Sequence, residues 1–144
     1  MTTKTTDVFQ VEHIEYVTDR PLDEVASALE GATGDLTDGK YASEVASAKD
    51  KGDFEARARR FEADSGFMRF LTLNHGGFLT LMGFPAKVRQ YTMGNPLIAA
   101  TILQHDVGAA LNVPVRLIGN SELTTAARKL DDKLAALVER VMRP

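Results

Sequence analysis

Residues 91–103, YTMGNPLIAATIL, contain the sharpest change of pattern in this chain. The residues before Gly94 alternate between two faces, as expected of a strand. Gly94 permits a tight turn, Asn95 is suited to capping free backbone N–H groups, and Pro96 fits the first turn of a helix. Apolar side chains dominate the rest of the stretch. It therefore predicts a strand that ends at a glycine turn and continues into a buried helix.

The residues upstream predict an antiparallel meander. Residues 67–73 and 87–93 have the alternation of strands, and 78–82 reads as a strand between them. The sequence NHGG at 74–77 is typical of a hairpin turn, and GFP at 83–85 is typical of a second turn. Three consecutive strands joined by tight turns are therefore expected before the central helix.

The N-terminal part predicts a strand followed by a helix. Residues 1–7 are polar and are expected to form a flexible tail, whereas 8–17 are rich in β-branched and aromatic side chains. Pro21 lies in the first turn of a helix whose apolar residues recur at helical spacing. These residues are Leu22, Val25, Ala26 and Leu29. Gly31 and Gly34 end the helix.

Residues 35–66 are expected to form a helical insert. A first short helix is predicted around Tyr41 and Val45, and a second, strongly charged helix over 53–64. The second helix carries only a thin apolar stripe, which is typical of a helix that leans on a surface. We interpret the insert as a surface addition, with a lid or a dimer arm as the alternatives.

The C-terminal part predicts one more strand and a long helix. Residues 113–118 have a strand pattern, and Pro114 places its start at a sheet edge or leaves its N–H side unpaired. Ser121 is expected to begin the last helix, whose apolar stripe continues to Val141 over about 30 Å. The predicted fold class is α+β, with a curved antiparallel sheet of about four to five strands packed against helices. The predicted order is β-α-β-β-β-α-β-α with the helical insert.

Composition limits the classes of protein and partner. The 144 residues, 44% of them apolar, suit a single domain over 8–144. Without cysteine, the chain has neither disulfides nor thiolate chemistry. A formal charge of −3 with interspersed signs argues against a nucleic-acid partner. The apolar run 97–103 is far shorter than the ~20 residues that cross a bilayer, and MTTKTTD lacks the apolar core of a signal peptide. We expect a cytoplasmic protein with no membrane partner.

The stretch 91–103 and the later LNVPVRL at 111–117 resemble the domain-of-unknown-function family numbered 302. That family carries a Gly-Asn-Pro element before a short helix and a Leu-Pro-type element that opens a strand. The chain departs from it in its charged insert and in lacking another extended segment before the last helix. The resemblance implies a small α+β domain with helices against one curved antiparallel sheet, often paired as a homodimer. It implies no activity.

Few residues suggest catalytic or metal chemistry. The histidines, His13, His75 and His105, are far apart and match no metal-binding spacing, so no metal site is predicted. No pattern identifies a cofactor. His105 is the best candidate for a functional imidazole, because Asp106 beside it is able to fix its tautomer. Ordinary capping of a helix C-terminus is the simpler interpretation of this histidine.

The turn at 94–96 offers a helix N-terminus, which attracts anions. An arginine on a flanking strand, Arg89 or Arg116, would complete a phosphate or carboxylate pocket. The simpler interpretation is a tight turn at Gly94 with Asn95 as the cap. No catalytic residue is identified, and the candidate ligand-binding residues are Gly94, Asn95, Pro96, His105 and Arg116.

Three functions stay open on the sequence. The first is a homodimeric, non-enzymatic domain that binds a small apolar or amphipathic ligand between sheet and helices, as the aromatic and methionine-rich meander suggests. The second is a small-molecule enzyme that uses His105 and Asp106 as an acid–base pair, which requires His105 to face a cavity. The third is a protein-interaction module that uses the insert and the last helix.

Overall fold

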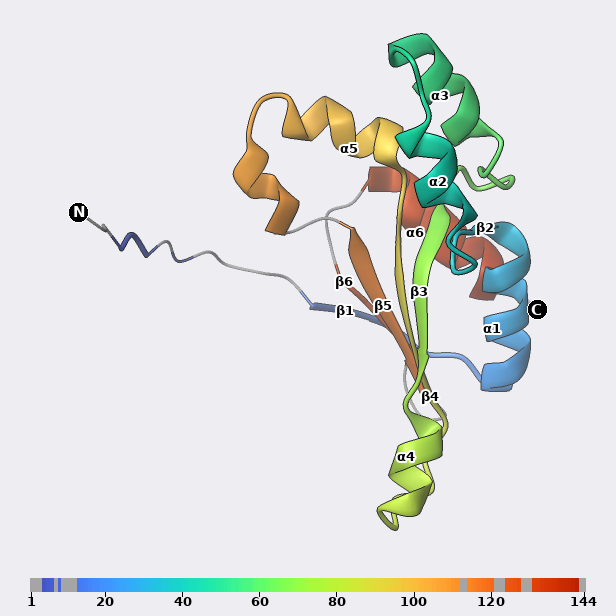
Figure 1. The fold of residues 1–144 in the computed structure, drawn as a ribbon. Helices are drawn as coiled ribbons and strands as arrows, with labels where there is room; N and C mark the ends of the chain where they lie inside the picture. The colour runs from blue at the N-terminus through green and yellow to red at the C-terminus, as the bar shows by residue number, and fades with distance from the viewer. Residues whose placement is uncertain are drawn as a thin grey trace.

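The chain forms one open, twisted sheet in the computed structural model (Figure 1). The structure describes residues 4–6, 8, 13–111, 114–120, 124–127 and 131–142. Within these residues the sheet has six strands, in the order β1-β6-β5-β4-β3-β2. The strands are β1 (His13–Tyr16), β2 (Gly34–Asp35), β3 (Met68–Asn74), β4 (Val88–Gly94), β5 (Val115–Asn120) and β6 (Thr124–Ala127). Neighbouring strands are antiparallel, except that β2 and β3 are parallel. The α+β class is confirmed, with a mixed sheet.

The first and last helices of the chain, α1 (Leu22–Ala32) and α6 (Asp131–Met142), cover one face of the sheet and form the core with it. The other described helices are α2 (Lys40–Ala46), α3 (Lys51–Arg59), α4 (Gly76–Leu81) and α5 (Pro96–Leu103), with a 3₁₀ turn η1 (Val107–Leu111). The apolar stripe predicted for α1 is buried as expected. Side chains of α1, α6 and the central strands meet in one cluster: Val25, Ala26, Leu29, Phe67, Tyr91, Met93, Val115, Leu137, Val138 and Val141.

The strand predicted over 78–82 is wrong, because this segment lies in and just after helix α4. The strands β3 and β4 pair directly with each other, from Met68 opposite Gly94 to Asn74 opposite Arg89. The connection between them carries α4, which projects past one end of the sheet (Figure 1). A short apolar run such as FLTLM has no periodicity that separates helix from strand. Its local hydrogen bonds decide the outcome, since the Thr80 hydroxyl and the Leu79 amide both donate to the preceding turn.

The last helix also begins later than predicted. Strand β6 occupies Thr124–Ala127 and α6 begins at Asp131, whereas residues 121–123 and 128–130 lie outside the described residues. Strand β6 lies between β1 and β5 and pairs with both. Pairing on two sides stabilises an extended conformation whatever the local helix propensity. The extended segment that the chain seemed to lack before its last helix is therefore present.

The two short helices predicted within 35–66 are confirmed as α2 and α3. Arg57 of α3 joins the two helices: its Nε lies 2.8 Å from Asp53 Oδ1 and its Nη1 3.0 Å from Glu44 Oε2. Ala58 is fully buried. Among the described helices, none is long and apolar enough to cross a membrane.

Candidate functional site

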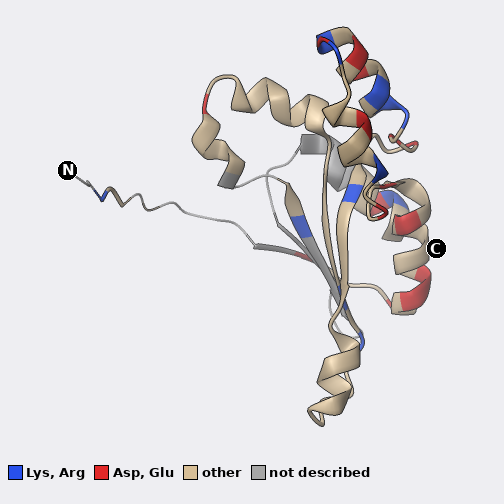
Figure 2. Ribbon diagram, in the orientation of Figure 1, with Lys and Arg blue, Asp and Glu red and all other residues tan. Residues whose placement is uncertain are grey.

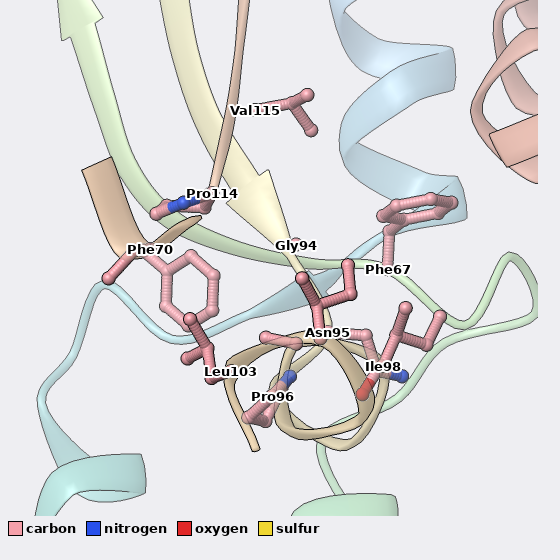
Figure 3. Close-up of a pocket in the computed structure, with 12 residues that line it drawn as sticks. Phe67, Phe70, Gly94, Asn95, Pro96, Ile98, Leu103, Pro114 and Val115 are labelled. Atoms are coloured by element: carbon pink, nitrogen blue, oxygen red, sulfur yellow. The ribbon is translucent and has the colours of Figure 1, made fainter. Parts of the chain in front are cut away.

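An apolar pocket of about 210 Å³ opens beside the turn that joins β4 to α5 (Figure 3). Phe70 and Leu103 line one side and Phe67 and Ile98 the other. The full lining is Phe67, Phe70, Gly94, Asn95, Pro96, Ile98, Ala99, Ile102, Leu103, Ala110, Pro114 and Val115. Nearly all of these side chains are apolar, so the pocket favours apolar contents.

Gly94 is needed for the close approach of two walls of this pocket. A Cβ at this position would lie 3.2 Å from Pro114 Cβ and 3.4 Å from Phe70 Cε2. Both distances are tight for carbon atoms, whose attraction is best near 3.5–4.0 Å. Any larger residue would push the start of β5 away from β3 and change the shape of the pocket.

The Asn95 side chain is a structural cap that uses its oxygen and its amide nitrogen for hydrogen bonds within the chain. Its Oδ1 accepts from the Leu97 amide at 2.8 Å, which caps α5, and Pro96 occupies the first helical position as predicted. Its Nδ2 donates to Glu62 Oε1 at 2.6 Å and to the Gly66 carbonyl at 2.8 Å. The Glu62 carboxylate therefore lies close to the end of the helix that attracts anions.

The other two candidate residues lie away from this pocket. His105 is exposed in the turn after α5 and does not belong to the lining. Asp106, its proposed partner, accepts the Gly108 amide with Oδ1 at 2.8 Å and so closes the next turn. Arg116 is exposed on β5 next to Val115, which is buried and lines the pocket. Because side chains alternate along a strand, Arg116 is on the opposite face of the sheet.

The comparisons with known proteins place the chain in a family. Residues 43–122, more than half of the chain, match the model of Domain of unknown function DUF302. The chain belongs to the DUF302 family. It is also similar to a solved structure described as an uncharacterized conserved protein DUF302 from Bacillus stearothermophilus. The identity is 16%, the match covers 91% of this chain and 86% of that one, and the TM-score is 0.49. No curated protein matches this DUF302 chain.

A polar network of this DUF302 chain lies under α1, on the face of the sheet that α1 and α6 cover. The Tyr91 hydroxyl donates to Glu30 Oε1 at 2.8 Å, and Arg89 Nη1 lies 3.7 Å from the same carboxylate oxygen. Burial, followed by the hydrogen bond to Glu30, raises the pKa of Tyr91 to about 12. This network was not predictable from the sequence, because its members come from a helix and a strand that are far apart in the chain.

Beside the first residues of β4, a polar pocket of about 340 Å³ lies between α1 and the connection that carries α4. Its charged side chains already bind one another: Lys87 Nζ and Arg89 Nη2 lie 2.9 and 2.8 Å from the two carboxylate oxygens of Asp23. The hydrogen bond from Lys87 lowers the pKa of Asp23. Over the described part of this DUF302 chain, no cluster of three histidine or acidic side chains is arranged to hold a metal ion.

Proposed function

We propose that the pocket beside Gly94, Asn95 and Pro96 binds a small apolar molecule without transforming it. The observation that carries this proposal is the almost wholly apolar lining supplied by α5, β3 and the start of β5. The volume, about 210 Å³, exceeds the ~150 Å³ of an engineered apolar cavity that takes up benzene. One aromatic ring or a short branched hydrocarbon is the expected size.

The polar contacts available to a ligand are fewer than the sequence suggested. Asn95 uses both its oxygen and its amide hydrogens within the chain. His105 and Arg116 do not line the pocket. An apolar ligand is therefore favoured over an amphipathic one with a charged head, which would leave its charge unpaired among apolar walls.

An enzyme based on His105 and Asp106 has no support from the geometry, since that proposal needed His105 to face a cavity. The homodimer and the cytoplasmic location expected from the sequence stay part of the proposal. Neither is needed for the pocket to bind its ligand.

Binding is tested with the isotope-labelled protein and neutral aromatic probes. Benzene, indole and naphthalene are titrated while the methyl signals of Ile98 and Ile102 are followed by NMR, because both side chains line the pocket. We expect saturable shifts of these methyl groups. Ala99→Leu fills the pocket and should weaken binding at least about tenfold, the equivalent of about 1.4 kcal/mol.

Ala100→Leu is the matched control, because Ala100 is the next residue of α5, is exposed and does not line the pocket. It should bind the probes as the unchanged protein does. Absence of saturable shifts up to the solubility of all three probes would refute the proposal. Equal affinities in the Ala99→Leu and Ala100→Leu proteins would move the binding elsewhere.

A further inference from the structure

The connection between β3 and β4 forms an apolar arm that extends past the sheet (Figure 1). We call residues 75–87 the β3–β4 arm; it contains α4 and the turn that follows. Four of its five large apolar side chains are exposed, with exposed fractions of 53% for Phe78, 88% for Leu81, 70% for Met82 and 65% for Phe84, whereas Leu79 is half-buried. Monomeric proteins rarely expose several large apolar side chains side by side. Such a cluster is therefore typical of an interaction surface.

Charged residues are absent from nearly all of this arm. Residues 75–86 contain no aspartate, glutamate, lysine or arginine, and the helix of the arm carries no charge colour in Figure 2. Charged residues gather instead on α1, α2 and α3 (Figure 2). Depletion of charge is typical of the centre of a protein–protein interface.

The apolar surface continues from the arm onto the uncovered face of the sheet. Tyr91 and Met93 face α1 and α6, so the alternate residues Gln90 and Thr92 are on the other face. Their partners in β3 are Leu73 and Leu71, whose exposed fractions are 38% and 45%. Leu71 and Leu73 thus form an exposed apolar row on the uncovered face.

His75 links this row to the arm. Its Nε2 lies 3.0 Å from Gln90 Oε1, and its ring meets the Phe78 ring edge-on with 5.6 Å between centroids. Phe78 therefore extends the row of Leu71 and Leu73. We call Leu71, Leu73 and Phe78 the open-face strip. Arg116, exposed on the same face, belongs to β5, two strands away from β3, and would lie at a polar rim.

The area suffices for a stable dimer. At roughly 200 Å² per aromatic side chain, the exposed parts of Phe78 and Phe84 amount to about 240 Å². Leu81 and Met82 add about as much, which brings the arm to roughly 500 Å², the size of the largest apolar patch on a typical monomer. Together with Leu71 and Leu73 of the two strips, two arms present roughly 1,300 Å² of apolar surface, which is at the lower end of the range of specific interfaces.

We propose that the β3–β4 arm and the open-face strip form the interface of a homodimer, in which the arm of each copy lies on the strip of the other. Each chain carries both an arm and a strip, so a twofold axis places the arm of either copy on the strip of the other. A lipid surface is less favoured, because the chain is acidic overall and Lys87 at the base of the arm is bound to Asp23. The inference supplies the interface of the proposed homodimer and is independent of the ligand.

The oligomeric state is measured by sedimentation velocity between 1 and 100 µM, roughly the range in which weak dimers dissociate. We expect the unchanged protein to have twice the 15.7 kDa mass of one chain. The double variant Leu81→Lys and Met82→Lys should be monomeric, with its dimer affinity lowered at least about 100-fold. Val107→Lys is the matched control: Val107 is 82% exposed, lies outside the arm, and should leave the dimer intact.

A second measurement identifies the surfaces in contact. The chain contains no cysteine, so Leu73→Cys and Leu81→Cys proteins can be mixed and oxidised. We expect a disulfide between the two different variants, because the strip of one copy faces the arm of the other. Circular dichroism checks that each variant keeps its fold.

Each remaining outcome overturns a defined part of the inference. A monomeric unchanged protein at all concentrations would remove both the homodimer and its interface. A dimer that survives the double lysine variant, without the mixed disulfide, would keep the homodimer and reject this interface. A monomer that sediments with phosphatidylcholine–phosphatidylglycerol vesicles through its arm would replace the second copy with a lipid surface. Probe binding at Ile98 and Ile102 should be unchanged in the lysine variant, which separates this test from that of the ligand.

Discussion

Gly34 is packed so closely that no side chain fits on it. A Cβ at this position would overlap the backbone carbonyl oxygen of Phe61. Gly34 also donates its amide to the Phe67 carbonyl at 2.8 Å, where β2 joins the sheet. The segment after α3 and the edge of the sheet therefore meet backbone to backbone at this glycine.

Gly34→Ala is expected to destabilise the protein by about 3 kcal/mol or more, because the backbone has to move. Gly31→Ala is the matched control, since a Cβ at Gly31 of α1 meets nothing within 4 Å. In a helix this second change should stabilise by about 0.5–1 kcal/mol. Urea denaturation measures both. Two variants of equal stability would contradict the packing at Gly34.

Tyr91 predicts a loss of stability in alkaline solution. Burial raises its pKa from 10.0 to about 12 in the folded chain, so the unfolded chain ionises first. The contribution is complete below pH 10 and is lost as the pH rises from 10 towards about 12. A difference of this size corresponds to roughly 2–3 kcal/mol.

Tyr91→Phe should remove this part of the pH dependence and cost about 1 kcal/mol near pH 7, where the hydrogen bond to Glu30 is lost. Unfolding free energies at several values from pH 7 to 11 provide the check. An identical slope above pH 10 in both proteins would show that Tyr91 is not the group responsible.

The β3–β4 arm predicts that a whole element is dispensable for folding. The buried residues of the described chain all lie outside it. His75 donates its amide to the Val88 carbonyl at 2.9 Å, so the two strands are already paired at the base of the arm. An Asn-Gly turn in place of residues 76–87 would close such a pair as a two-residue hairpin.

We expect this shortened chain to fold as a monomer, with the far-UV spectrum of the same sheet and a melting temperature within about 5 °C of the monomeric Leu81→Lys and Met82→Lys double variant, because loss of the dimer affects both proteins equally. Thermal unfolding followed by circular dichroism measures it. A chain that no longer unfolds cooperatively would show that the arm supports the fold.

The β3–β4 arm also shows which information about structure is missing from a local stretch of sequence. The glycine turns around 76 and 83 were visible, but the segment between them suits either a returning strand or a helix. The choice depends on which strand β3 pairs with, and that partner, β4, lies beyond the arm. The cap and proline that begin α5 were predictable because they act within a few residues. The partners of Asn95 in Glu62 and Gly66 were not, because only the tertiary fold brings them together.

For the fold and the pocket together, the sequence predicted the α+β class and the turn beside which the pocket lies. It did not predict the walls of the pocket, which come from three separate parts of the chain: the start of β3 with Phe67 and Phe70, helix α5, and the residues around Pro114. It also missed β6, whose four residues acquire their extended form from the strands on both sides. Contacts between distant segments decided each of these features.

The pairing of β1 with β6 has a consequence for how the chain assembles. Strands β3, β4 and β5 find partners nearby in the sequence, whereas β1 joins residues about 110 positions later. Closing so long a loop carries the larger entropic cost, so the β3–β4–β5 ladder should form first and β1 should dock last. During synthesis β1 would leave the ribosome long before β6, so its backbone hydrogen-bonding groups would stay unpaired until β6 follows. We therefore expect β1 to be the strand that depends most on chaperones.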